Sequence, residues 1–173
     1  MQKIHSRIAT VEDAVLLADI SSTTFFDTYH AYNTKEDMDM FLQDHFNLDV
    51  ITKELNNTEN IFLLVYEDEQ LCGYAKLNES KIPEAVQDFP VIEIARIYAV
   101  KEKIGKGIGK ILIEECIAVA KQKNKQMIWL GVWKENPRAI AFYQKNGFEI
   151  FGEQDFILGK DVQHDWLMKK NLS

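Results

Sequence analysis

The hydrophobic and polar positions of the first 55 residues predict one strand and three helices. Residues 3–9 alternate between apolar and polar side chains, as expected for a strand. The sequence Thr10–Asp13 is a weak capping box, and the apolar positions that follow it up to Ile20 recur at helical spacing. A second start signal at residues 34–37 predicts another amphipathic helix, and residues 50–55 predict a short third one.

The pattern changes to that of strands after this region. Residues 61–66 and 71–77 are strand-like and are joined by a short acidic turn, which predicts an antiparallel hairpin. Residues 79–90 contain two prolines and several acids, and they predict a loop. A longer strand is predicted at residues 91–100.

The C-terminal half alternates between helix and strand. Apolar positions from 111 to 120 recur at helical spacing, and residues 127–133 form a nearly continuous apolar run, typical of a strand buried on both faces. Strand, helix and strand in this order predict a parallel pair with a crossover helix. Asn136 as the N-cap, Pro137 at the first helical position and Gly147 just past the end delimit a helix at 137–146.

Two further strands, at residues 148–151 and 163–169, complete the predicted fold. The expected class is α/β, with one central mixed sheet that is mostly antiparallel, a parallel strand pair and flanking helices. The chain has no repeat and no linker-like segment, so we expect residues 1–173 to form a single domain.

Charge and hydropathy exclude several classes of partner. A net charge of −7 disfavours a nucleic-acid partner, because phosphate contacts require a basic surface. No apolar run is long enough to cross a bilayer, and the N-terminus lacks the apolar segment of a signal peptide. We therefore expect a cytoplasmic protein with neither a nucleic-acid nor a membrane partner, present as a monomer or a homodimer.

The cysteines and histidines predict neither a disulfide nor a metal site. Cys72 and Cys116 are far apart in the sequence and have no ligand spacing, so they are expected to be buried thiols. The four histidines form no zinc motif, and no metal is expected.

A glycine-rich turn at residues 103–110 is the first segment that predicts chemistry. It follows a strand and opens a helix, where free backbone N–H groups and the helix dipole bind phosphate, and its glycines allow close approach of an anion. The Walker pattern fails because Ile111 replaces Ser or Thr, and the dinucleotide fingerprint fails because Lys110 replaces the third glycine. The alternative is a turn that merely joins strand to helix.

This turn resembles the Gln/Arg-x-x-Gly-x-Gly/Ala motif of the GNAT acetyltransferases, which holds the pyrophosphate of coenzyme A. Gly107 and Gly109 match its glycines, whereas Ile104 replaces Gln or Arg, and Lys103 and nearby lysines can supply charge. The segment 136–148 similarly resembles the family's Asn-x-x-Ala-x-x-Phe-Tyr-x-x-x-Gly-Phe pattern. The resemblance implies acetyl-CoA as cosubstrate. The implied cofactor-binding residues are Ile97, Tyr98, Ala99, Val100, Ile104, Gly105, Lys106, Gly107, Ile108, Gly109, Lys110, Asn136, Tyr143 and Lys145.

Nearly the whole chain is similar to one branch of that family. Segments 24–29, 93–98 and 128–133 look like those of the PaiA-type spermidine/spermine acetyltransferases. The resemblance implies a small-molecule amine as substrate, with a polyamine as the expected acceptor.

Two side chains are implied as catalytic. Glu93 stands at the spacing of the glutamate base of some GNAT enzymes and is expected to accept the amine's proton through a water, although it can instead pair with an ammonium group or with Arg96. Tyr143 is expected to protonate the departing thiolate, the alternative being an aromatic packed beside Phe142. Backbone N–H groups of residues 97–100 are expected to polarise the thioester carbonyl. Transfer is expected to be direct, because neither cysteine sits in an activating motif.

For the acceptor pocket, the family resemblance implies the first two helices and the loop before residue 91. Other acceptors, such as a protein N-terminus or an antibiotic amine, a non-catalytic CoA-binding regulator and a nucleotide-binding module are the alternatives. The candidate pocket residues, each of which can also be an ordinary surface charge or packed aromatic, are Asp27, Tyr29, Glu36, Asp37, Glu84 and Asp88.

Overall fold

The computed structural model describes residues 1–172 and contains, within them, seven strands and five α-helices. The strands are β1 (Ile4–Ile8), β2 (Asn60–Glu67), β3 (Gln70–Asn78), β4 (Val91–Ala99), β5 (Met127–Trp133), β6 (Glu149–Leu158) and β7 (Asp161–Asn171). The helices are α1 (Ala14–Tyr29), α2 (Lys35–Phe46), α3 (Leu48–Asn56), α4 (Ile108–Gln122) and α5 (Pro137–Lys145).

The strands form one sheet in the order β1-β2-β3-β4-β5-β7-β6. Neighbouring strands are antiparallel except β4 and β5, which run parallel and are connected by α4. The predicted mixed, mostly antiparallel sheet with one parallel pair is therefore confirmed.

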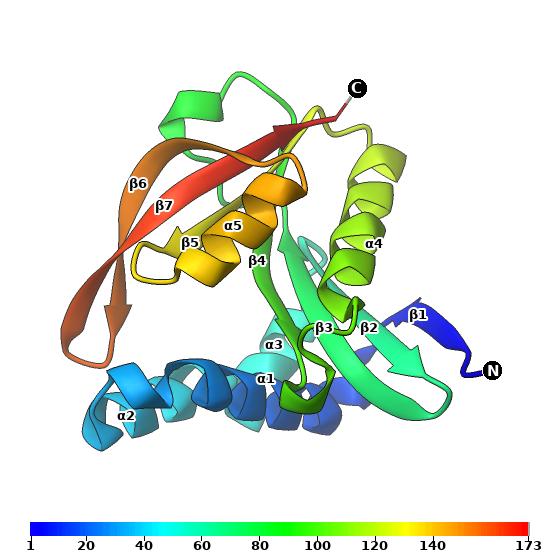
Figure 1. Ribbon diagram of the computed structural model, residues 1–173, viewed down its shortest axis with the longest axis vertical. Coiled ribbons are helices and arrows are strands. Elements are labelled where there is room, and N and C mark those ends of the chain that lie inside the picture. The colour runs from blue at the N-terminus through cyan, green and yellow to red at the C-terminus, as the bar shows by residue number, and fades with distance from the viewer. Residues whose placement is uncertain (173) are drawn as a thin grey trace.

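Helices cover both faces of the sheet (Figure 1). On one face, α4 packs over β2, β3 and β4, and α5 packs against the same apolar core through Phe142 and Tyr143. On the other face, α1, α2 and α3 enclose a second core that includes Leu17, Phe25 and Tyr74. The alternation of β2 supplies both cores, because Leu63 and its alternate neighbours face α4 while the residues between them face α1.

Short polar signals place the helix ends as predicted. Thr34 accepts a hydrogen bond from the Asp37 N–H at 3.1 Å and so caps α2. Asn136 caps α5 in the same way, with its Oδ1 accepting from the Ala139 N–H at 3.2 Å. Gly147, with φ of +89°, takes the left-handed conformation that ends this helix.

Three elements are longer than predicted. The helix that follows the capping box continues through Tyr29, because apolar and small side chains keep facing the core and the hydroxyls of Thr24 and Thr28 bond to carbonyls one turn back at 2.7 Å. Strands β6 and β7 form a long hairpin whose outer strand is mostly half-exposed or exposed, so its hydrophobic pattern is weak. None of the five helices in residues 1–172 is both long enough and apolar enough to cross a membrane.

A buried ion cluster fixes β3 and β4 against α3. Both oxygens of Glu54 accept from the guanidinium of Arg96, at 2.7 and 2.8 Å, and one of them lies 3.1 Å from the ammonium of Lys76. The two cations hold the pKa of Glu54 below its ordinary value despite burial. Arg96 is thereby committed to Glu54, and the expected alternative pairing of Arg96 with Glu93 is not the one seen.

Candidate active site

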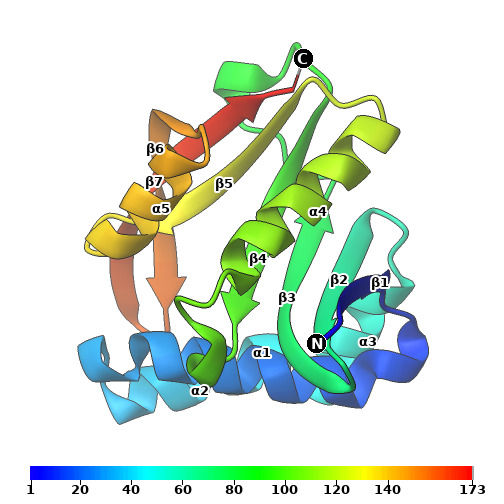
Figure 2. The ribbon, with the colours of Figure 1, turned by 45° about the vertical axis from the view of Figure 1, so that its right-hand side comes forward.

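The parallel strands β4 and β5 separate partway along their length. Their pairing covers only Val91–Glu93 with Met127–Trp129 in the described chain. An extra residue, Ala95, interrupts the register of β4 with β3 just beyond the last pair and bends the strand. Figure 2 shows the two strands together at one end of the sheet and spreading apart toward α1 and α2.

A cavity of about 290 Å³ lies where the two strands diverge, on the α1 and α2 side of the sheet. This volume suits a small ligand. Its polar lining includes Glu93 and Tyr98 from β4 and Asp165 from β7. Besides Tyr98, the Phe, Tyr and Trp side chains of the lining are Phe25, Tyr29, Phe41, Phe46, Trp133 and Phe156.

Glu93 is the buried acid on the β4 side of this cavity. Its side chain is only 11% exposed, and burial raises the pKa of its carboxyl even though Lys81, Lys76 and Arg96 favour the charged form. A carboxyl whose pKa is raised toward neutrality is suited to accept a proton from an amine. The position of Glu93 is therefore compatible with its predicted role as a base.

Asp165 is a second cavity acid, which the sequence analysis missed. Burial raises its pKa, while Gln154 and two cations oppose the shift. A Cβ atom on Gly131 of β5 would lie 2.6 Å from the Gln154 amide and 3.3 Å from the Asp165 carboxylate, so this glycine makes room for both. The alternation of β7 could have identified Asp165 as buried, because this residue lies on the same face of the strand as the buried Leu167.

The glycine turn opens α4 on the opposite face of the sheet. Gly105 and Gly107 have φ of +79° and +89°, a conformation that favours glycine. A Cβ atom on Gly107 would have no atom within 4 Å, so this N-cap residue faces open space. The first N–H groups of α4 have no partner inside the helix and carry the positive end of its dipole. The turn is thus shaped to receive an anion.

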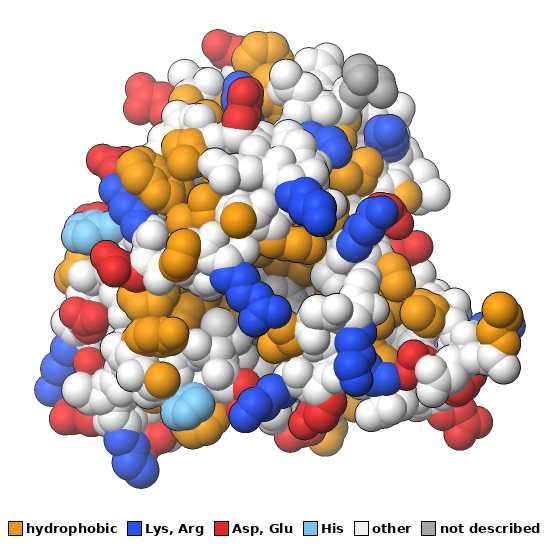
Figure 3. All heavy atoms as spheres, viewed as in Figure 1, with side chains coloured by type: hydrophobic (Ala, Val, Ile, Leu, Met, Phe, Trp, Pro, Cys, Tyr) orange, Lys and Arg blue, Asp and Glu red, His pale blue; other side chains and the backbone are white. Residues whose placement is uncertain are grey.

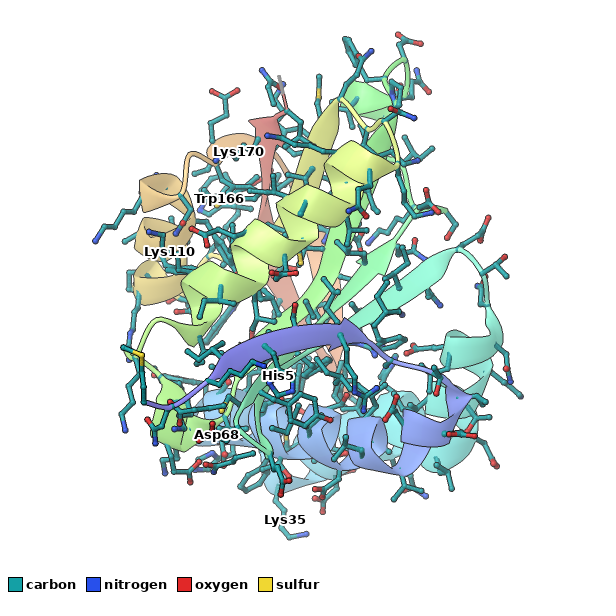
Figure 4. The ribbon with its side chains drawn as sticks, turned by 90° about the vertical axis from the view of Figure 1, so that its right-hand side faces the viewer. His5, Lys35, Asp68, Lys110, Trp166 and Lys170 are labelled. Atoms are coloured by element: carbon teal, nitrogen blue, oxygen red, sulfur yellow. The ribbon has the colours of Figure 1, made fainter. Side chains whose placement is uncertain are left out.

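Basic side chains surround this turn. A guanidinium nitrogen of Arg138, in the first turn of α5, lies 3.9 Å from the position that a Cβ atom on Gly105 would take. Lys106 is exposed, and Lys110 extends from the start of α4 beside α5 (Figure 4). Lys103 differs, because it pairs with Glu67 of the β2–β3 hairpin. Lys and Arg side chains lie around the hollowed centre of this face in Figure 3.

Helix α5 packs close to this end of α4. A Cβ atom on Gly109 would lie 3.1 Å from the Phe142 ring, so the glycine has a packing role besides its predicted contact with the cofactor. Arg138 and Lys145 lie on the same side of α5 as Phe142 by helical spacing. Ile104, at 46% exposure, brings no polar group to the turn, and Asn136 uses its side-chain oxygen for the cap described above.

Tyr143 reaches the cavity region from the α5 side. Its ring packs against Phe142 and Phe148, and it interacts electrostatically with Tyr29 and Tyr98, which line the cavity from the other face. Tyr143 packs against the core under α4, whereas Tyr29 and Tyr98 pack against the core under α1, so they belong to opposite faces of the sheet. Burial raises the pKa of Tyr143, so its hydroxyl keeps its proton at neutral pH.

The backbone of β4 also faces the gap. The N–H of Val100 donates to the Cys72 carbonyl of β3 at 2.9 Å, which removes this group from the predicted set of carbonyl-polarising donors. Because N–H directions alternate along a strand, Tyr98 also directs its N–H to β3, whereas Ile97 and Ala99 direct theirs toward the gap. Of the four backbone N–H groups predicted to polarise the thioester carbonyl, those of Ile97 and Ala99 therefore remain as candidates.

The expected acceptor-pocket residues are mostly elsewhere. Of the six, Tyr29 alone lines this cavity in the described chain. Asp37 accepts from the Lys160 N–H at 2.9 Å and Glu36 lies 3.4 Å from the Lys160 ammonium, so both hold α2 to the β6–β7 turn. The other three, which lie outside the lining on α1 or on the loop before β4, are Asp27, Glu84 and Asp88.

Comparison with known proteins identifies the family. The sequence profile of the Acetyltransferase (GNAT) family matches residues 17–148, which include both the glycine turn and α5. The chain belongs to the GNAT acetyltransferase family. The predicted family, its N-acetyltransferase activity and acetyl-CoA as cosubstrate are therefore confirmed at the level of the family.

Individual relatives agree with this family assignment. An uncharacterised N-acetyltransferase of Lactobacillus delbrueckii subsp. lactis is 37% identical over 88% of each chain. A spermidine N(1)-acetyltransferase of Thermoplasma acidophilum is 27% identical over 92% of this chain and 98% of its own. The crystal structure of a PaiA N-acetyltransferase from Thermoplasma acidophilum in complex with coenzyme A superposes with a TM-score of 0.79 at 24% identity, covering 98% of this chain and 99% of that one.

The open glycine turn leads to a first prediction. Gly107→Ala should lose most of the thermal stabilisation that acetyl-CoA gives the wild type, because a Cβ atom would occupy the space in which the backbone meets the pyrophosphate. Gly147→Ala is the matched control, since Gly147 has the same φ of +89° but lies past α5. Both variants should lose about 1–2 kcal/mol of stability from the left-handed backbone. Equal acetyl-CoA stabilisation of the two variants in thermal melts would contradict the assignment.

Proposed function

We propose that the protein transfers the acetyl group of acetyl-CoA directly to a small primary amine, and that the acceptor is a polyamine such as spermidine or spermine. The observation that carries the proposal is the junction at which β4 and β5 separate. There the anion-receiving turn opens α4 on one face of the sheet, and the acid-containing cavity lies on the other face where the two strands diverge.

The residues around the glycine turn fit the phosphates of acetyl-CoA. Residues 105–109 offer backbone N–H groups and open space, and Lys106, Lys110 and Arg138 offer positive charge without the family's Gln or Arg at Ile104. When bound, acetyl-CoA supplies the activated acetyl group. The gap-facing N–H groups of Ile97 and Ala99 are the donors placed to polarise its carbonyl oxygen.

Proton transfer is assigned to two side chains on opposite sides of the gap. An alkylamine with a pKa near ~10 must lose a proton before it attacks, and Glu93 is the buried base that accepts it, directly or through a water. Tyr143 retains its proton and donates it to the leaving thiolate. Direct transfer is supported by Cys116, because burial raises the pKa of its thiol to about 12 and keeps it protonated.

The cavity chemistry supports a polyamine as the acceptor. Glu93 and Asp165 present carboxyl groups from β4 and β7, and seven Phe, Tyr and Trp side chains line the space around them. Aromatic faces can contact methylene chains and attract ammonium groups, while the carboxylates pair with those groups. The spermidine acetyltransferase of Thermoplasma acidophilum among the relatives supports the same acceptor class.

A panel of acceptors tests the proposed function. Thiol release from acetyl-CoA should be fastest with spermidine or spermine among polyamines, amino acids, peptides and aminoglycosides. The rate at subsaturating polyamine should fall as ionic strength rises, because salt screens the attraction between the acids and a polycation. Preference for a peptide or an aminoglycoside would contradict the polyamine acceptor. If none of the amines in the panel caused thiol release, the catalytic proposal itself would be contradicted.

The role of Glu93 predicts a pH dependence. Activity should fall as the pH decreases through the raised pKa of Glu93, because protonation removes the base. Glu93→Gln should lower kcat by roughly 10²-fold or more and abolish this acidic limb. Asp165→Asn is the matched control, since it neutralises the other cavity acid and should raise KM more than it lowers kcat. If Glu93→Gln kept the wild-type kcat and the acidic limb of the pH profile, the proton of the amine would be accepted by bulk water instead of Glu93.

Tyr143→Phe isolates the proposed general acid, because it removes the hydroxyl and keeps the packed ring. We expect kcat to fall by roughly 10²-fold, with little change in acetyl-CoA affinity. The defect should shrink with a thioester whose thiol is more acidic, since that thiolate leaves without protonation. Phe142→Leu serves as a packing control on the same helix. Wild-type kcat for Tyr143→Phe, with chemistry rate-limiting, would reduce Tyr143 to a packing residue.

A further inference from the structure

Lys81 places a primary ammonium group beside the proposed base. It belongs to the loop that precedes β4, and its Nζ lies 3.8 Å from Glu93 Oε2 and 5.6 Å from the centre of the Trp129 ring. Neither the proposed mechanism nor the sequence analysis gave this lysine a role. The chain thus presents to its own cavity the same functional group that an amine acceptor would bring.

Glu93 is incompletely paired in this arrangement. Its Oε2 atom is buried and has no hydrogen-bond partner, and the 3.8 Å separation from Lys81 is longer than a direct hydrogen bond. A buried carboxylate oxygen without a donor costs free energy, which a better-placed ammonium would recover. The indole Nε1 of Trp129, whose Cα is paired in register with that of Glu93, is also buried without a partner. One hydrogen-bond acceptor and one donor in this region therefore remain unpaired.

The same ammonium also reaches Gln154, which neighbours the second acid. Lys81 Nζ lies 3.3 Å from the Gln154 Oε1, and its charge acts on the pKa of Asp165. A single cation thus lies between groups from β4, β6 and β7, all of which line the cavity. With Lys81 in place the two acids are not a free dianionic site, and an incoming polycation meets a positive charge first.

We propose that Lys81 occupies the position that an ammonium group of the acceptor takes, and that acceptor binding displaces it. This inference rests on the proposed amine acetylation. The exchange is physically accessible because the Lys81 side chain is 58% exposed, so its ammonium can move into water. Lys81 is then a specificity-determining residue, which offsets the attraction of the cavity for cations and does so most strongly for acceptors that carry more than one charge.

Binding measurements on lysine variants test the exchange without requiring turnover. Calorimetric titration of Lys81→Met with spermidine should show affinity about threefold to tenfold tighter than that of the wild type, because a partly solvated competing cation is removed. The gain should be larger for spermine and less than about twofold for the monoamine propylamine, since the Coulombic benefit grows with ligand charge. Lys81→Arg keeps the charge and should bind spermidine as the wild type does.

A second lysine controls for net charge. Lys121→Met removes a charge from the exposed end of α4, away from the cavity, and should leave spermidine affinity unchanged. Carbon NMR titration of the Glu93 carboxyl should show a higher pKa in Lys81→Met than in the wild type, because the nearest cation is lost. This readout follows the ammonium even where no acceptor turns over.

The outcomes separate this inference from the proposed function. Unchanged or weaker spermidine binding by folded Lys81→Met would overturn the exchange, as would an unchanged pKa of Glu93 or binding by neither protein. The first two results leave turnover of the acceptor panel by the wild type unaffected, whereas spermidine binding by neither protein would also contradict the polyamine acceptor. Conversely, tighter binding by Lys81→Met together with no acetylation of any amine would support a cation site and overturn the proposed function alone.

Discussion

The site depends on one constraint, which is that hydrogen-bonding groups of two central strands are left without a strand partner. Buried N–H and C=O groups normally pair, and a sheet interior is where pairing is most complete. Here the extra residue Ala95 bends β4 and its pairing with β5 ends at Glu93. The resulting opening lies between the face of the sheet that packs against α5 and the face that packs against α1. A ligand that supplies the missing partners is stabilised by the same groups that orient it.

Electrostatics divides the two faces into different environments. The turn before α4 gathers positive charge and a helix dipole, whereas the cavity behind the sheet holds two acids with raised pKa values and one exposed lysine. Burial raises the pKa values of both acids, and a bound cation offsets the cost of burying their charged forms. The proposed acetyl donor and the proposed amine acceptor can therefore each bind to a surface of complementary charge, one on each side of the opening.

The sequence predicts the local elements and the cofactor end better than it predicts the acceptor cavity. Thr34, Asn136 and Gly147 act through neighbouring backbone groups, so their roles are visible in short segments. The cavity is assembled from α1, α2, β4, β6 and β7, whose relative positions no local pattern contains. The family resemblance pointed to the first two helices and so to Glu36 and Asp37, which hold a surface turn. The length of β6 was also underestimated, because a mostly exposed strand shows little alternation of apolar and polar residues.

The close approach of Gly109 to Phe142 connects the two regions to which the ends of acetyl-CoA are proposed to bind. Gly109 belongs to the first turn of α4, the proposed phosphate site, and Phe142 adjoins Tyr143, the proposed acid at the sulfur end. With 3.1 Å between the ring and any added Cβ atom, neither residue can gain volume alone. Across the family, the side chains at these two positions should therefore covary in size, a larger one at the first position accompanying a smaller one at the second. Such covariation would preserve the spacing of the two helices.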